Sequence, residues 1–133
     1  ARENRKQLDA FFGALAKSLN DAGVQLLAGS DSGAFNSYTY PGISLHKELQ
    51  VMVENGISPL DALRTSTANG AKFLNQTDDY GRISKGKISD LVILDANPLK
   101  NIENTQKIYT VIKGTQVFSK RQLQELLNNS VID

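Results

Sequence analysis

The acidic side chain of Asp31 stands where many enzymes carry a functional group. It follows a short apolar run at residues 24–28, and Gly29 and Gly33 flank it. In α/β folds the C-terminal ends of buried parallel strands carry the functional side chains. The two glycines would let the backbone turn sharply and let a ligand or metal ion approach closely. The alternative is an Asx turn in which Asp31 only ends the strand, and the local sequence leaves both interpretations open.

The single histidine of the chain, His46, is the second candidate. It falls in the first turn of a helix predicted after residue 42, where the partial positive charge of the helix N-terminus lowers its affinity for a proton. A neutral imidazole there could bind a metal ion or hydrogen-bond to Asp31. The alternative is a helix residue bonded to a nearby backbone carbonyl. With one histidine and no cysteine, the chain excludes metal sites built mainly from imidazoles, zinc–cysteine sites, iron–sulfur clusters, disulfides and thiol catalysis.

The loop after Asp31 carries further candidates. Ser32, Phe35, Tyr38 and Tyr40 lie in a stretch rich in Gly, Ser, Asn and Tyr, which is typical of a loop. These side chains could line a substrate pocket, or the aromatic rings could pack on their own scaffold. No Gly-x-Gly-x-x-Gly, Walker loop or Gly-x-Ser-x-Gly motif is present, so nucleotide-binding and serine-hydrolase interpretations lack support.

Length and composition indicate one folded domain. The chain has 133 residues, of which 40% are hydrophobic and 22% charged, with a formal net charge of +1. This balance argues against nucleic acid and anionic membranes as partners, since both require a clustered basic excess. No apolar run approaches the roughly 18 to 20 residues that cross a bilayer. Residues 1–6 are polar and no methionine leads them; the cytoplasm is the default localisation, with any N-terminal signal lying outside this chain.

Helical periodicity dominates the first half of the chain. One face of a helix ending at Gly23 collects the apolar residues of positions 8–22, and residues 24–28 then predict a strand buried on both faces of a parallel sheet. A second helix ends at Gly56. Ser58 and Pro59 begin a third segment, predicted as two short helices joined near residues 67–70.

Strand signals dominate after residue 75. We expect strands at residues 81–83, 87–95, 108–112 and 116–118, with Asp90 and Asp95 serving as strand ends rather than as an acid–base pair. Gly114 predicts a type II′ hairpin turn between the last two strands. Ser119 and Gln122 resemble a capping box that opens a final helix.

The order of these pieces resembles a known family. The segments that carry the likeness are Leu26-Leu27-Ala28-Gly29-Ser30-Asp31, Leu45-His46-Lys47-Glu48-Leu49, residues 52–59, Ala68-Asn69-Gly70-Ala71-Lys72-Phe73-Leu74, residues 81–83, residues 86–95 with Gly-Lys-x-x-Asp-Leu-Val, Asn97-Pro98-Leu99 and residues 111–113. From about residue 19 to 118 the chain is similar to the C-terminal third of the amidohydrolase superfamily of metal-dependent hydrolases, in particular its imidazolonepropionase-like and prolidase-like branches.

The resemblance implies an α/β fold: the C-terminal part of a (β/α)8 TIM-type barrel plus the C-terminal strands of an accessory composite β-sandwich. Residues 1–75 would end the barrel, with residues 24–28 as strand eight; residues 76–118 would be sandwich strands and 119–133 a C-terminal helix and tail. It further implies that Asp31 is the metal ligand and proton acceptor, while Ser32, His46, Tyr38 and Tyr40 would line the pocket or support it. Ser89 replaces the family's usual alanine, and Gly114-Thr115 its usual Asp-Gly or Asn-Gly turn.

The family's other metal ligands, a His-x-His pair, a mid-barrel lysine or glutamate and two later histidines, are absent. We therefore expect this chain to be a fragment of an amidohydrolase that uses a divalent metal ion, expected to be zinc. The enzyme would hydrolyse an amide, cyclic amide or dipeptide C–N bond of a small-molecule substrate. The isolated chain is expected to be inactive and to bind no zinc tightly. The missing N-terminal part of the polypeptide, or another copy, would pack on the barrel strand. The alternative is a non-catalytic binding or structural module that retains the scaffold.

Overall fold

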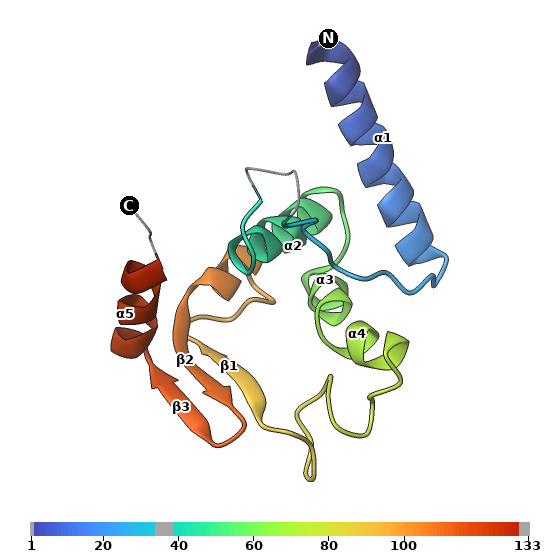
Figure 1. The fold of residues 1–133 in the computed structure, drawn as a ribbon. Helices are drawn as coiled ribbons and strands as arrows, with labels where there is room; N and C mark the ends of the chain where they lie inside the picture. Colours follow the sequence, from blue (N-terminus) through green and yellow to red (C-terminus); the bar gives the residue numbers. More distant parts are fainter. Residues whose placement is uncertain (1, 34–38, 131–133) are drawn as a thin grey trace.

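Helices form the first part of the protein, and a small antiparallel sheet forms the second. The computed structural model describes residues 2–33 and 39–130. Its helices are α1 (Arg2–Asp21), α2 (Ile43–Glu54), α3 (Pro59–Thr65), α4 (Ala68–Phe73) and α5 (Lys120–Ser130), with a 3₁₀ helix, η1 (Ile102–Gln106). The strands β1 (Asp90–Leu94), β2 (Ile108–Lys113) and β3 (Gln116–Ser119) pair in that order. Figure 1 shows α5 beside this sheet, and α1 extending away from the rest.

Backbone hydrogen bonds at the helix ends follow the predicted chemistry. Gly23, at φ 79°, ends α1: its N–H donates to the carbonyl of Asn20, while Val24 N–H donates to that of Leu19, which is the Schellman arrangement. Ser58 caps α3 by accepting the N–H of Asp61 at 3.1 Å, with Pro59 in the first turn. The prediction of two short helices after Ser58 is confirmed.

The hairpin and the last helix also form as predicted. Lys113 pairs with Gln116 across a two-residue turn in which Gly114 has φ 59°. Ser119 and Gln122 make the capping box at the start of α5: Gln122 Oε1 accepts the N–H of Ser119, and Ser119 Oγ accepts that of Gln122.

The two carboxylates around β1 have structural partners. Asp90 accepts hydrogen bonds from Lys113 Nζ and from the N–H of Gly114 at 3.0 Å. Asp95 forms an ion pair with Lys120 at 2.8 Å. Both contacts agree with the prediction that these residues serve the strand ends.

Three strand predictions need correction. Residues 24–28 form no strand and pair with none in the described part of the chain, and Val24 and Leu27 are 48% and 42% exposed. A strand needs hydrogen bonds to the backbone of a neighbouring strand, and the three described strands pair only with one another. Residues 81–83 form no strand: the chain bends at Gly81, which has φ 88°, and Ile83 is 88% exposed. The predicted strand at 87–95 begins only at Asp90.

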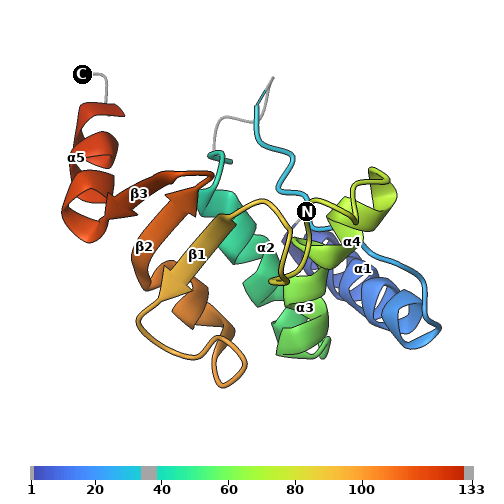
Figure 2. The ribbon, with the colours of Figure 1, turned by 90° about the horizontal axis from the view of Figure 1, so that it is seen from below.

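The core joins the two parts of the molecule. It is made of buried residues from α2, α3, η1 and the turn after α2: Leu49, Met52, Ile57, Ala62 and Ile102. The views in Figures 1 and 2 place α2 beside η1. By contrast, the apolar stripe of α1 is largely uncovered within the described residues; Phe11 and Phe12 are 60% and 56% exposed. None of the described helices is both long and apolar enough to span a bilayer.

Candidate functional site

Asp31 follows the segment of residues 24–28, which contacts α3 and α4 through hydrogen bonds to Thr65 and Asn69. Its backbone is left-handed, with φ 49°, a conformation that aspartate adopts more readily than most residues. Its carbonyl accepts a hydrogen bond from Thr39 Oγ1 at 3.2 Å. Within residues 2–33 and 39–130 the carboxylate accepts no hydrogen bond, so the bond that defines an Asx turn is not formed there. The residue is exposed, and its carboxylate is available to a ligand.

His46 is bonded to a different part of the molecule. Its Nδ1 lies 3.0 Å from Oγ1 of Thr105, a buried residue of η1. The Thr105 hydroxyl donates its hydrogen to the carbonyl of Ile102 at 2.8 Å, so it must accept from Nδ1–H of His46. The neutral ring therefore carries its proton on Nδ1 and a lone pair on Nε2. Burial lowers the pKa of His46 below its usual value.

This contact corrects two expectations for His46. Its described partner is neither the carboxylate of Asp31 nor a backbone carbonyl, but a side-chain hydroxyl 59 residues further along the chain. The bond connects α2, the helix that follows the Asp31 loop, to the η1 segment next to the sheet. Joining these elements is the role of His46 that the contacts support.

The loop candidates differ in what the structure says of them. Ser32 is exposed, and Tyr38 lies outside the described residues, as does Phe35. Tyr40 is 57% exposed. Its N–H donates to Ser44 Oγ at 2.8 Å, and its carbonyl accepts the N–H of Ser44, so the backbone of Tyr40 helps to begin α2.

The donor atoms for a metal ion are incomplete in the described part of the chain. There, no three side chains of His, Cys, Asp or Glu gather as a metal site would require. A catalytic zinc takes about three protein ligands besides water. Asp31 can supply one oxygen ligand, and His46, whose Nδ1 is bonded to Thr105, could supply at most one nitrogen ligand through Nε2. These residues alone do not fit a complete metal centre.

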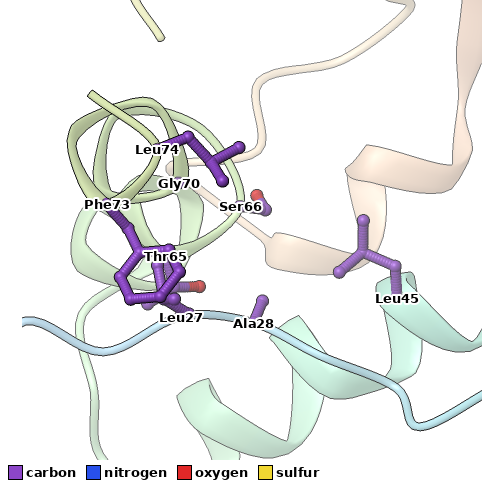
Figure 3. A pocket seen from close by; sticks show the side chains of 8 residues that line it. All are labelled: Leu27, Ala28, Leu45, Thr65, Ser66, Gly70, Phe73 and Leu74. Atoms are coloured by element: carbon purple, nitrogen blue, oxygen red, sulfur yellow. The ribbon is translucent and has the colours of Figure 1, made fainter. Parts of the chain in front are cut away.

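An open hollow of about 260 Å³ lies beside the segment before Asp31. Figure 3 shows its lining side chains, which come from that segment, α2, α3, α4 and the residues between them: Leu27, Ala28, Leu45, Thr65, Ser66, Gly70, Phe73 and Leu74. None of these side chains is charged and none is a predicted site residue. The lining of the hollow is therefore mostly apolar, as on surfaces that pack against other side chains.

Comparison with known proteins identifies the family. The model of the amidohydrolase family matches residues 2–117. This chain belongs to the amidohydrolase family. The resemblance inferred from the sequence motifs is therefore confirmed, and the match includes Asp31, α1 to α4 and most of the sheet.

Relatives and solved structures agree with this assignment. The amidohydrolase chain is 33% identical over 102 residues to ochratoxinase from Aspergillus niger, covering 73% of this chain and 20% of that protein. It is 40% identical over 81 residues to imidazolonepropionase from Salinispora tropica, covering 61% and 20%. A Xaa-Pro dipeptidase with bound methionine in its active site matches with a TM-score of 0.71 and 29% identity, covering 80% and 25%. The chain thus spans between a fifth and a quarter of these proteins.

Two polar contacts that sequence reasoning missed hold the amidohydrolase chain together around the candidate site. One is Thr105, which partners His46. The other is Asn69 of α4, whose Nδ2 donates to the carbonyl of Leu26 at 2.8 Å. The available signal for Asn69 was an asparagine inside a short helix, where it is a poor helix former.

Proposed function

We propose that the complete protein is a metal-dependent hydrolase of C–N bonds, in which Asp31 contributes one ligand to a divalent metal ion. The metal that we propose is zinc. The observation that carries this is the amidohydrolase family match over residues 2–117, which includes Asp31. The Asp31 carboxylate accepts no hydrogen bond from residues 2–33 and 39–130. The named relatives support amides, cyclic amides and Xaa-Pro dipeptides as substrate classes to test.

In this proposal Asp31 has two tasks. A bound divalent metal supplies Lewis-acid activation of a water molecule. In the complete protein, the carboxylate of Asp31 would help to hold the metal and would accept a proton from the activated water. Its exposure and left-handed backbone support this role, because a carboxylate engaged in an Asx turn would be less available to a metal ion. His46, Ser32, Tyr38 and Tyr40 stay proposed as residues that line or support the substrate pocket.

The remaining ligands would come from polypeptide beyond this chain. Uncovered apolar side chains on α1 and on the segment before Asp31, such as Phe11, Phe12 and Leu27, support the packing of further polypeptide there. We propose residues 1–75 as the end of a (β/α)8 barrel, 76–118 as strands of a β-sandwich and 119–133 as a C-terminal helix and tail. The isolated chain would then be inactive, since Asp31 alone cannot hold a catalytic metal.

The test is the Asp31→Asn variant of the complete protein. Asparagine keeps the shape but cannot accept the proton, so turnover of amide, cyclic amide and Xaa-Pro dipeptide substrates should fall by about 10²- to 10⁴-fold or more. The circular dichroism spectrum should be unchanged.

The matched control is Asp95→Asn, which makes the same chemical change at an exposed ion pair with Lys120 and should leave turnover near normal. Near-normal turnover in Asp31→Asn would refute the role of Asp31. A wild-type protein that binds no divalent metal and hydrolyses none of these substrates would instead favour the non-catalytic module, for which the incomplete donor set of the described residues is the supporting observation.

A further inference from the structure

Two hydrogen bonds fasten the segment that leads to Asp31. The carbonyl of Leu26 accepts from Asn69 Nδ2 at 2.8 Å, and the N–H of Ala28 donates to the carbonyl of Thr65 at 3.2 Å. No strand pairs with this segment among the described residues. Figure 3 shows Leu27 and Ala28 running past Thr65 and Gly70, the neighbour of Asn69. Within the described residues, α4 and the C-terminal residue of α3 therefore hold the segment through these two bonds.

The helical end of this attachment is firmly packed. Thr65 is 3% exposed, and its hydroxyl donates to the carbonyl of Ala62 at 2.6 Å. Ala62 is fully buried in the core cluster. Because α3 is packed in the core, a displacement of the segment relative to α3 would break its hydrogen bond to Thr65.

Asn69 contributes little to its own helix. Asparagine favours turns and caps over helix interiors, and the cap position of α4 is taken by Thr67, which makes no side-chain cap bond. The side chain of Asn69 reaches instead to a carbonyl 43 residues earlier in the chain. Its amide thus serves the segment before Asp31 rather than the stability of α4.

We propose that Asn69 is a positioning residue for Asp31, acting through the carbonyl of Leu26. Asp31 comes three positions after Ala28, so its Cα lies within about 11 Å of the Ala28 Cα. A shift of about 1 Å at a catalytic group can cost about 10²-fold in rate. The inference rests on the proposed function of Asp31, and the test below includes a measurement that does not depend on turnover.

The test compares two asparagines in the complete protein. Asn104 provides the matched control, because its Nδ2 also donates to a backbone carbonyl, that of Asn97, at 2.9 Å, but in the η1 region. Asn69→Ala is expected to lower kcat by about 10-fold to 10²-fold, with KM changed less than twofold. Hydrogen exchange at the Ala28 amide should become at least about 10-fold faster, which corresponds to a loss of about 1.4 kcal/mol in the free energy of local opening. Asn104→Ala should change neither, whatever its effect on thermal stability.

A second variant guards against a folding defect. In Asn69→Asp, the ionised carboxylate faces the Leu26 carbonyl and repels it, whereas the protonated acid can donate to it again. Its kcat relative to wild type should therefore recover as the pH falls through the pKa of the new carboxyl, and that of Asn69→Ala should not.

Unchanged Ala28 exchange in Asn69→Ala would overturn the proposal whether or not the protein turns over a substrate. So would an equal loss of kcat in Asn104→Ala. Faster exchange with normal kcat would also overturn it, since the segment would then be loosened without consequence for Asp31. Failure of Asp31→Asn to reduce turnover would instead overturn the proposed function itself.

Discussion

Replacing Thr105 by valine tests the structural role of His46. Valine matches threonine in size but lacks the hydroxyl, so Nδ1–H of His46 loses its acceptor at 3.0 Å and the carbonyl of Ile102 loses one of its donors, at 2.8 Å. An orphaned buried polar group costs about 1–3 kcal/mol. The half-buried ring of His46 can turn to water, whereas Thr105 and Ile102 are 6% and 5% exposed. We therefore expect the free energy of unfolding to fall by about 1–3 kcal/mol.

The assay is urea denaturation at pH 8 in a double-mutant cycle with His46→Ala. The two substitutions should couple by about 0.5–1.5 kcal/mol, because each removes the same hydrogen bond. Thr105→Ser, which keeps the hydroxyl, should retain the coupling with His46→Ala. A coupling near zero would refute the contact. A His46→Ala protein of wild-type stability but without turnover would show instead that His46 belongs to the reaction site.

Two further predictions concern packing and pH. In Gly81→Ala, at φ 88°, the new Cβ would lie 2.7 Å from that of Ala71, whereas at Gly86, at φ 91°, nothing lies within 4 Å of the new Cβ. Gly86→Ala should therefore lower the free energy of unfolding by about 1–2 kcal/mol through backbone strain alone, and Gly81→Ala by about 1–3 kcal/mol more through the clash. Equal losses of stability in thermal melts of the two variants would contradict the contact with Ala71. Because burial lowers the pKa of His46, the unfolded chain takes up the proton first. The free energy of unfolding should therefore fall as the pH drops from 6.5 toward the lower folded-state pKa, and His46→Asn should flatten this slope. Burial raises the pKa of Glu48, which acts in the opposite direction at lower pH.

Helix ends and the hairpin could be predicted because a few neighbouring residues determine them. Ser58 accepts the N–H of Asp61 three residues on, and Gly114 provides the positive φ of a two-residue turn. Ser119 and Gln122 satisfy each other's backbone groups within four residues. In each case both partners of the hydrogen bond lie inside a short window of sequence, and the chemistry of the residue types is sufficient.

Contacts between distant residues could not be predicted in this way. His46 and Thr105 are 59 positions apart, and Asn69 and Leu26 are 43 apart. The sequence indicated that His46 needs a partner but offered many hydroxyls, carbonyls and carboxylates as candidates. The strand predicted at residues 81–83 is absent for a related reason: the chain bends at Gly81, which packs against Ala71, and only the fold brings these two residues together.

The segment at residues 24–28 shows what a strand prediction needs besides the local sequence. Apolar residues such as Val24 and Leu27 predict burial on both faces of a parallel sheet, and these side chains are 48% and 42% exposed here. A parallel strand takes its hydrogen bonds from segments remote in sequence, so the pattern encodes the need for partners but cannot provide them. Where the described residues lack those partners, side-chain and backbone bonds from α3 and α4 to Leu26 and Ala28 decide the path of the chain. The position of Asp31 is then set by helices that follow it in the sequence, which is why the residue type of Asn69 matters as much to the site as that of the aspartate's own neighbours.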